Sequence, residues 1–297
     1  MQKDEKWKIL IGNYLKDFLS FFMPKLNEQI DFDKGYEFLD GELNRIKIKS
    51  KSRNRRSDKL VKVYLKDGTE QYLLIHIEIQ GYDEDDFSDR MFTYYYRISD
   101  LHKTRNITAI SVYTENNKSF KPNKFENKVF GTEILYKYNT YKVLEQNEKS
   151  LKKSNNIFAF LVLAVLYALK AKDNQKTKLK FKIEITKILV ERNYSQEDIN
   201  ELFEFINLFL SFSSEKYDNL FYEELDKMPK IKEKEVLNSF EKFMMKKLKP
   251  QVEESINNQK TIEIARNLKN LGVDINKISQ ATGLTIAEVE ELKKSIK

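Results

Sequence analysis

The sequence predicts an α/β domain over residues 1–150, followed by an all-helical C-terminal part. Three observations favour this class. Residues 75–80 read IHIEIQ, in which isoleucine alternates with polar residues as in a half-buried strand. An Asp-Gly dipeptide separates this run from a second alternating run, as expected of a β-hairpin. Beyond residue 150, apolar residues recur at helical spacing, most densely in IFAFLVLAVLYAL at 157–169.

The expected elements of the α/β domain follow one another along the chain. Pro24 breaks a helical N-terminal stretch, and GYEFLDGELNRIKI is predicted as a short helix of its own. In order, we expect helices over the first 45 residues, a hairpin over 58–80, a helix over 87–100, and strands over 107–114 and 133–145.

The remainder of the chain is predicted to be helical. Ser195, with Asp198 three positions later, is the expected N-cap of a helix over 195–212. The tail over 262–294 reads as three short helices with turns at Gly272 and Gly283. We therefore expect three parts: a core over 1–150, a helical extension packed on it over 151–250, and a small helix-turn-helix-like module over 251–297.

Composition excludes several classes of protein. The 297 residues include no cysteine and two histidines, so a disulfide scaffold, a Cys nucleophile and a Cys or His zinc site are excluded. No apolar run is long enough to span a membrane, and MQKDEKWKIL lacks the apolar core of a secretory signal. We expect a cytoplasmic protein that does not enter membranes. The net charge of +7 is compatible with an anionic partner such as nucleic acid, or with a generally lysine-rich proteome.

The register of the hairpin follows from its apolar residues. Those of both strands must face one core, and directly opposed residues share a face, so paired residue numbers must have an even sum. A two-residue loop gives an odd sum, whereas a three-residue loop over 66–68, with Gly68 left-handed, gives an even one. This register places Asp58 opposite His76 and Glu78 diagonal to Asp58, at about 7–8 Å between Cα atoms.

Two carboxylates on adjacent strands can hold an oxygen-loving cation. Mg²⁺ is commonly bound by one or two carboxylates, waters and substrate phosphate oxygens, and it lowers the pKa of a bound water. The third polar residue, Gln80, can orient the attacking water but brings no positive charge. His76 is as compatible with packing or exposure as with a role beside phosphate.

The segment SDKLVKVYLKDGTEQYLLIHIEIQ resembles the core of the PD-(D/E)XK nuclease superfamily, a restriction-endonuclease-like mixed sheet flanked by helices. More narrowly, it is similar to the Rpn recombination-promoting nucleases, also called YhgA-like transposases, with an Asp on one strand and Glu-x-Gln on the next. IDFDKGYEFLDGELNRI resembles that family's N-terminal segment, FSDRMFTYYYRISD its Arg-Met-x-x-Tyr helix, and GVDINKISQATGLTIAEVEEL its terminal module. The resemblance is densest over 30–115.

The resemblance implies roles for particular residues. Asp58 and Glu78 are the expected metal ligands, joined by the backbone carbonyl of Ile79. Gln80 stands where the superfamily usually has lysine and would orient water or substrate, and Glu42 matches a common helical acid. The implied cofactor is Mg²⁺, with Mn²⁺ or Ca²⁺ as alternatives. The implied reaction is hydrolysis of a DNA phosphodiester by metal-activated water.

Candidate nucleic-acid contacts come from two segments. They are Arg55, Arg56 and Lys59 at the first strand of the hairpin, and Arg90, Tyr94 and Arg97 on one face of the helix over 87–100. A solvated loop and salt bridges to the acidic residues 83–86 are the alternatives. In the tail, Glu288, Glu290 and Glu291 on the third helix favour a packing or protein-contact role over base reading.

The function expected from the sequence is that of a metal-dependent DNA endonuclease associated with recombination or transposition. The alternative is an inactive nucleic-acid-binding or assembly protein on the same fold, with Gln80 marking the loss of activity. The expected partner is DNA, and the resemblance also allows a homodimer.

Overall fold

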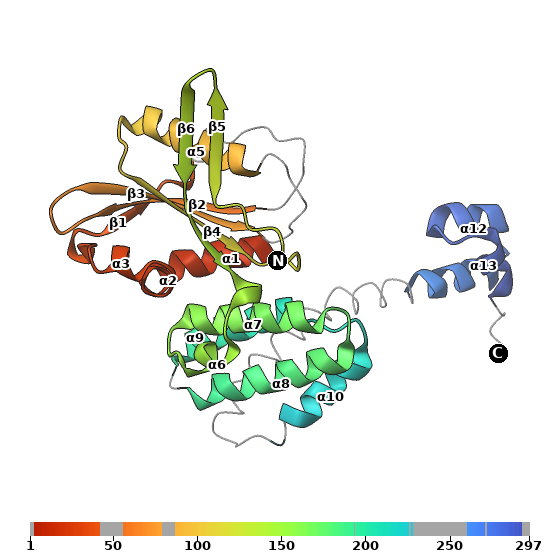
Figure 1. The fold of residues 1–297 in the computed structure, drawn as a ribbon. Coiled ribbons are helices and arrows are strands. Elements are labelled where there is room, and N and C mark those ends of the chain that lie inside the picture. Colours follow the sequence, from red (N-terminus) through yellow and green to blue (C-terminus); the bar gives the residue numbers. More distant parts are fainter. Residues whose placement is uncertain are drawn as a thin grey trace. The chain divides into compact units, whose positions relative to one another are not determined.

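The computed structural model describes residues 3–41, 56–78, 87–192, 194–225, 227, 260–270 and 272–292, and leaves the side chains of 56–58 and 76–78 undescribed. Residues 1–236 and 237–297 form two compact units (Figure 1). The sheet and the helices that follow it up to residue 225 therefore belong to the same unit.

A mixed five-stranded sheet lies at the centre of the first unit, as the predicted fold class requires. Its strands are β1 (Tyr36–Phe38), β2 (Arg56–Tyr64), β3 (Glu70–Glu78), β4 (Ile107–Tyr113) and β7 (Asn139–Lys142). Their spatial order is β1-β2-β3-β4-β7. The first three are antiparallel, whereas β3, β4 and β7 are parallel to one another.

Helices cover both faces of this sheet (Figure 1). Helix α5 (Phe87–His102) connects β3 to β4 and packs on one face, where Leu60, Leu74 and Ala109 are buried with Met91 and Ile98. The other face buries residues of β2 and β3 that alternate with these: Val61, Val63, Leu73 and Ile75. Each such side chain contributes about 1.5–3 kcal/mol when it leaves water, so both layers are needed for stability.

Three N-terminal helices precede the sheet: α1 (Lys3–Asn13), α2 (Leu15–Phe22) and α3 (Pro24–Asn27). Pro24 occupies the first turn of α3, where its missing N–H costs no hydrogen bond, so the predicted break is confirmed. A short 3-10 turn, η1 (Phe32–Lys34), leads from them to β1.

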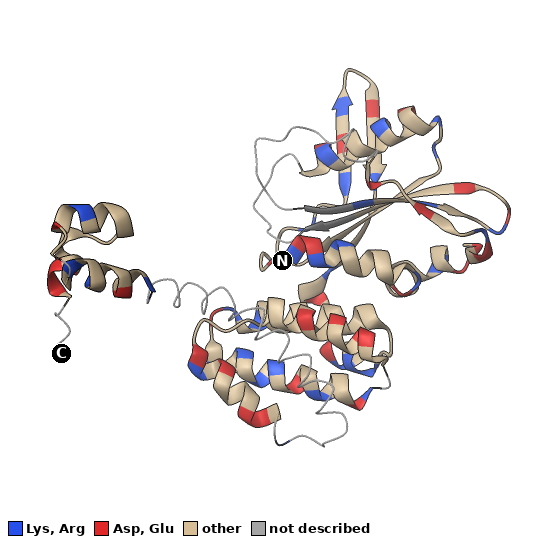
Figure 2. Ribbon diagram, turned by 180° about the vertical axis from the view of Figure 1, so that it is seen from behind, with Lys and Arg blue, Asp and Glu red and all other residues tan. Residues whose placement is uncertain are grey.

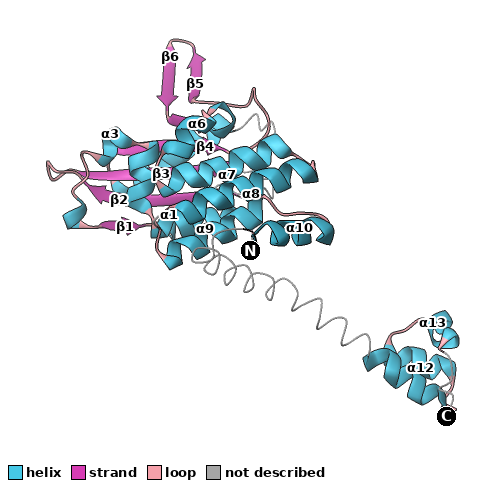
Figure 3. Ribbon diagram, turned by 90° about the horizontal axis from the view of Figure 1, so that it is seen from below, coloured by secondary structure: helices cyan, strands magenta, loops and turns pink. Residues whose placement is uncertain are grey.

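The helical part of the first unit consists of α6 (Glu148–Lys153), α7 (Ile157–Ala171), α8 (Gln175–Glu191), α9 (Gln196–Phe209) and α10 (Glu215–Leu225). Helix α7 packs against α6, α8 and α9, which lie beside it in Figure 3. It is buried on nearly every side, as its uniformly apolar sequence predicts. Ser195 and Asp198 form the predicted capping box at the start of α9. None of the described helices is both long and apolar enough to cross a membrane.

Helix α1 joins the helical part to the sheet. The Trp7 ring lies 6.2 Å from that of Phe158 on α7 and 5.3 Å from that of Phe205 on α9. The buried ammonium of Lys6 bonds the carboxylates of Glu201 at 2.5 Å and Glu204 at 3.0 Å. These contacts hold α1 against α9 while α1 also packs on β2.

Two sequence expectations for this unit are corrected. The segment 35–48 was expected to be helical, but Tyr36–Phe38 forms β1, which pairs with β2. Residues 40 and 41 are helical, and 42–48 lie outside the described residues. The single strand expected over 133–145 is instead β6 (Thr132–Lys137), β7 and the 3-10 turn η2 (Val143–Glu145). Strand β6 forms a separate two-stranded sheet with β5 (Lys124–Val129), which was not predicted.

Among the described residues of the second unit, 260–270 are helical and are followed by α12 (Ile275–Thr282) and α13 (Ile286–Glu291), with the turns near Gly272 and at Gly283 that the sequence predicts. Ala265, Ile278 and Val289, one from each helix, form its small core. The Lys269 ammonium donates to the carbonyls of Val289 at 2.9 Å and Glu290 at 2.7 Å, and so caps the C-terminal end of α13.

Candidate functional site

The β2–β3 hairpin turns through the predicted three-residue loop. The Leu65 N–H donates to the Thr69 carbonyl at 2.8 Å, and the Gly68 N–H donates to the Leu65 carbonyl at 2.9 Å. Gly68 has a φ of +88°, a left-handed conformation that costs other residues energy. The loop length and the conformation of Gly68 are therefore confirmed.

The register of the hairpin is also as predicted. Asp58 is paired with His76, and Arg56 is paired with Glu78, so Asp58 and Glu78 occupy diagonal positions on adjacent strands. Diagonal neighbours lie about 7–8 Å apart between Cα atoms. The side chains of these four residues are outside the described part of the structure, so the metal-binding roles of Asp58 and Glu78 stay predictions.

Rows of residues across the sheet change from apolar to polar towards one edge. The inner row, under α5, is Leu60, Leu74 and Ala109. The middle row is Asp58, His76, Ser111 and Thr140. The outer row is Arg56, Glu78, Tyr113 and Lys142. The polar rows thus lie at the carboxyl ends of three parallel strands, the edge where ligands bind in open α/β sheets.

The described side chains of these polar rows are held by internal contacts. Ser111 is fully buried, and its hydroxyl lies 3.8 Å from the Met91 sulfur on α5. The Tyr113 hydroxyl donates to the carbonyl of Pro122. The ring of Tyr113 also lies 5.6 Å from that of Phe120. This half of the edge is therefore a packed wall beside the position of Glu78.

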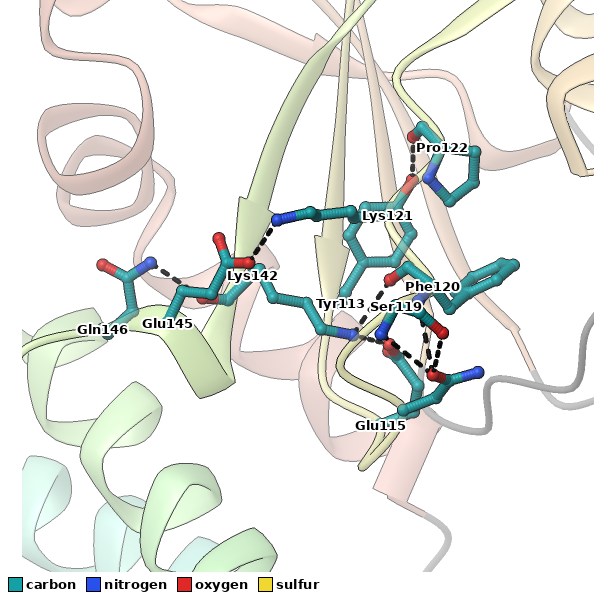
Figure 4. A network of polar contacts seen from close by, with 10 residues as sticks. Tyr113, Glu115, Ser119, Phe120, Lys121, Pro122, Lys142, Glu145 and Gln146 are labelled. Carbon is teal, nitrogen blue, oxygen red and sulfur yellow. Dashed lines mark hydrogen bonds and ion pairs between the residues drawn. The ribbon is translucent and has the colours of Figure 1, made fainter.

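Lys142 forms a buried ion pair with Glu115 (Figure 4). Each residue is 5% exposed. The Lys142 ammonium also donates to the carbonyl of Phe120 at 3.0 Å, which ties the loop after β4 to the end of β7. Burial lowers the pKa of the Lys142 amine to about 8, and the charge of Glu145 opposes that shift, so the amine is still protonated at pH 7.

Sequence reasoning missed this pair. The lysine in TYKVL and the glutamate in VYTEN are far apart in the chain, and neither has a local partner that would mark it as buried. The only local signal is a lysine that precedes two apolar residues in a strand-forming segment. Its alternation with Thr140 does not distinguish a buried site from a solvated one.

The candidate contacts on α5 do not form one open surface. Arg90 and Tyr94 were expected on an exposed face with Arg97, but each is only 2% exposed, between α5 and the sheet. The guanidinium of Arg90 lies 4.9 Å from the Phe87 ring. Burial raises the pKa of Tyr138, while the positive charge of nearby Arg90 opposes that rise. Arg97 is half-buried.

Lys59 lies on the other face of the sheet, away from α5. It is 7% exposed, and its ammonium bonds the Asp40 carboxylate at 3.0 Å and lies 4.0 Å from the Phe38 ring. Helix α1 passes over it, since a Cβ at Gly12 would lie 3.7 Å from the ammonium. A lysine in this position is not available to a phosphate, so we leave Lys59 out of the proposed nucleic-acid contact.

The other predicted site residues fall outside the described part of the chain. They are Glu42, Arg55, Ile79 and Gln80, together with the acidic residues 83–86. Among the residues whose side chains are described, no three His, Cys, Asp or Glu come together as metal ligands. The side chains of Asp58 and Glu78 are not among these described residues.

Comparison of the chain with protein-family models, with curated proteins and with solved structures finds no significant match. The resemblance to the Rpn nucleases therefore stays a prediction. What the structure adds is the mixed sheet flanked by helices, the register of its central hairpin and the polar edge at the end of that hairpin.

Proposed function

We propose that the chain is a divalent-metal-dependent DNA endonuclease on a PD-(D/E)XK core, with Asp58 and Glu78 as metal ligands. The observation that carries the proposal is the hairpin register, which puts two carboxylate-bearing residues in diagonal positions at the polar edge of the sheet. The mixed sheet with helices on both faces is the architecture that the resemblance implies.

The donor chemistry fits a hard divalent cation. Asp58 and Glu78 would supply carboxylate oxygens, and the Ile79 backbone would supply a carbonyl oxygen, the ligand types that Mg²⁺ prefers. When bound, the ion supplies positive charge beside a phosphate and makes water more acidic. Nothing in this donor set favours zinc, because the chain has no cysteine and two histidines.

The chain's own residues would then do the positioning. The Gln80 amide both donates and accepts hydrogen bonds, so it can orient the attacking water. Arg56, which precedes Asp58 by two residues on β2, and its neighbour Arg55 can bind phosphates of the DNA backbone and set its register. The net charge of +7 favours association with a polyanion.

Plasmid nicking in the presence of Mg²⁺ tests the proposal. The proteins to compare are wild type, Asp58→Ala, Glu78→Ala, and Glu70→Ala as a matched control at the far end of β3. We expect nicking by wild type and Glu70→Ala and its loss in the other two, with circular dichroism unchanged in all four. Equal cleavage by all four proteins would identify a contaminant and contradict the proposal. Parallel assays on RNA decide the substrate.

A second function is favoured by one residue. Gln80 brings no positive charge to the place where lysine is usual, and the described lysine of the outer row, Lys142, is engaged by Glu115. An inactive nucleic-acid-binding protein on the same fold would keep the basic residues without the chemistry. DNA binding by wild type without cleavage, under any divalent metal, would favour this second function.

A further inference from the structure

The hairpin formed by β5 and β6 exposes apolar side chains over its outer half. Val129 is 50% exposed, Phe130 104%, Ile134 39% and Leu135 52%. Phe130 and Gly131 have φ values of +44° and +85°, as in the two-residue turn that matches the twist of a hairpin. In Figure 1 the hairpin projects from the central sheet. Apolar side chains clustered in this way commonly mark an interaction site.

The base of the hairpin is fixed to α5 by aromatic contacts. The Phe125 ring stacks on Phe92 with centroids 4.5 Å apart, and the Tyr136 ring lies 4.8 Å from that of Tyr95. Contacts of this kind contribute about 0.5–1.5 kcal/mol each beyond the area that they bury. The outer half of the hairpin is therefore presented on an anchored base.

Strand β6 has an unpaired edge among the described residues, because its sheet contains only β5 and β6. In a hairpin with a two-residue turn, the pair that flanks the turn, Val129 and Thr132, exchanges hydrogen bonds, and every second pair does the same. Glu133, Leu135 and Lys137 consequently direct their backbone N–H and C=O groups to the outer edge. Such an edge, with exposed apolar residues and no proline, is a template for another strand.

The sequence of this edge is complementary to itself. A two-fold axis through Leu135 places Leu135 opposite its own copy, Ile134 opposite Tyr136, and Glu133 opposite Lys137. Cross-strand pairs of opposite charge and of apolar residues are both favourable. Moving the axis by one residue in either direction puts Glu133 and Lys137 opposite uncharged residues. One register therefore satisfies both the charges and the apolar residues.

The charges of the hairpin favour a protein partner over nucleic acid. The Lys128 ammonium lies 3.3 Å from the Glu133 carboxylate, and Lys124 forms an ion pair with Glu126. Two lysines of the hairpin therefore already have carboxylate partners. Both signs of charge are visible along the hairpin in Figure 2. A surface that binds a polyanion instead gathers cations that are free to contact phosphates.

We propose that β6 pairs antiparallel with β6 of a second copy of this chain, about a two-fold axis through Leu135, to form a four-stranded sheet. The contact is isologous, so it closes as a dimer and does not extend into a filament. The proposal is independent of the nuclease function, and either can fail without the other.

Charge reversal tests the register. We expect wild type to dimerise in sedimentation equilibrium over a micromolar concentration series, and Glu133→Lys and Lys137→Glu to raise the dimer Kd about tenfold or more each. An equimolar mixture of these two variants should dimerise as wild type does, because both cross-strand pairs then regain opposite charges. Asp100→Lys is the matched control, since it loses an exposed ion pair with Lys103 at the end of α5, outside the hairpin, and should leave the dimer unchanged.

A covalent readout tests the position of the axis. The chain has no cysteine, so Leu135→Cys introduces a sole thiol. Opposed hydrogen-bonded residues lie about 5.5 Å apart between Cα atoms, within disulfide range, so we expect rapid oxidation to a covalent dimer. Glu126→Cys, on the other strand, should not cross-link.

Three results would overturn the proposal: a monomeric wild type throughout the series, a mixture of the charge variants that stays monomeric, or equal cross-linking at 126 and 135. A monomeric wild type whose affinity for DNA falls on Phe130→Ala would assign the hairpin to nucleic acid instead.

Discussion

Replacing Lys142 by methionine probes the buried pair beside the polar edge. Methionine keeps most of the lysine stem, so packing against Tyr113 is largely preserved while the charge is removed. The variant leaves the Glu115 carboxylate buried without its cation and the Phe120 carbonyl without a donor that lies at 3.0 Å in the native protein. Removing one member of a buried pair typically costs about 3–5 kcal/mol.

The unpaired Glu115 carboxylate can take up a proton, and the free energy of that protonation is the most that its burial without a cation can cost. A glutamate with an ordinary pKa of about 4.3 can be neutralised at pH 7 for about 3.7 kcal/mol, and at pH 5 for about 1 kcal/mol. In the variant, burial raises the folded-state pKa of Glu115 above its unfolded value. The folded protein then binds more protons between the two values, so its stability rises as the pH falls. The penalty should shrink by about 2–3 kcal/mol between pH 7 and pH 5.

Urea unfolding followed by tryptophan fluorescence measures this effect. Trp7, the sole tryptophan of the chain, is fully buried in the first unit, so its signal reports on that unit. Lys121→Met is the matched control, because the Lys121 ammonium pairs with Glu145 at 2.6 Å with both side chains more than half exposed. Such a pair contributes less than about 1 kcal/mol. Lys142→Met with Glu115→Leu should recover most of the lost stability.

Either of two results would contradict the cost expected for the buried pair. One is a cost for Lys142→Met no larger than that for Lys121→Met at pH 7. The other is a cost that does not change between pH 7 and pH 5, because an unpaired buried carboxylate must respond to pH.

Three further substitutions test other parts of the first unit. Gly68→Ala should lower the free energy of unfolding by about 1–2 kcal/mol, because an added Cβ meets no atom but alanine is strained at a φ of +88°. An unchanged thermal unfolding transition would show that this strain is absent. Lys152 and Lys170 hold the pKa of Glu148 at about 2, so Glu148→Gln should lose about 1 kcal/mol at pH 7 and progressively less as the pH falls from about 4.3 through 2; a pH-independent loss in urea titrations would disprove this. Ser195→Ala should lower the free energy of urea unfolding by about 1 kcal/mol, because it removes the side-chain cap of α9. An unchanged free energy would show that the cap does not stabilise the helix.

The hairpin at the centre of the account was predictable because its signals are local. Alternation of apolar residues fixes the face, the Asp-Gly dipeptide fixes the turn, and the parity of the pairing fixes the loop length. Asp58 opposite His76 follows from these alone. Helix α7 and the capping box of α9 were likewise predictable, because each depends on residues that are close together in the sequence.

The elements that were missed depend on partners far away in the sequence. Strand β1 contributes three residues to the sheet, and only its pairing with β2 makes it a strand. Strand β5 is exposed along almost its whole length, so it has no apolar face, and its Phe125 finds its stacking partner, Phe92, on α5. A pattern within a short stretch of sequence cannot reveal either contact, because the two partners are far apart in the chain.

The orientation of α5 shows how a helical pattern misleads. The helical spacing of four apolar residues predicts a core face made of Phe87, Met91, Tyr95 and Ile98. The structure buries three of them but leaves Tyr95 half-buried, and it buries Tyr94 in its place. Positions three and four apart lie on one side of a helix, and polar residues within that stripe are buried with it. Arg90 was expected, from its spacing to Tyr94 and Arg97, on a face that could contact phosphates, whereas the structure buries it.

Binding of Mn²⁺, measured by calorimetry and by the loss of its free-ion paramagnetic resonance signal, tests the shared cation site most directly, since it needs no catalysis. We expect wild type and Glu70→Gln to bind the ion alike. Asp58→Asn and Glu78→Gln should each weaken that binding about tenfold or more, because each removes one of two carboxylate ligands. Equal affinity in all four proteins, or no binding by wild type, would contradict the claim that Asp58 and Glu78 hold one ion between them.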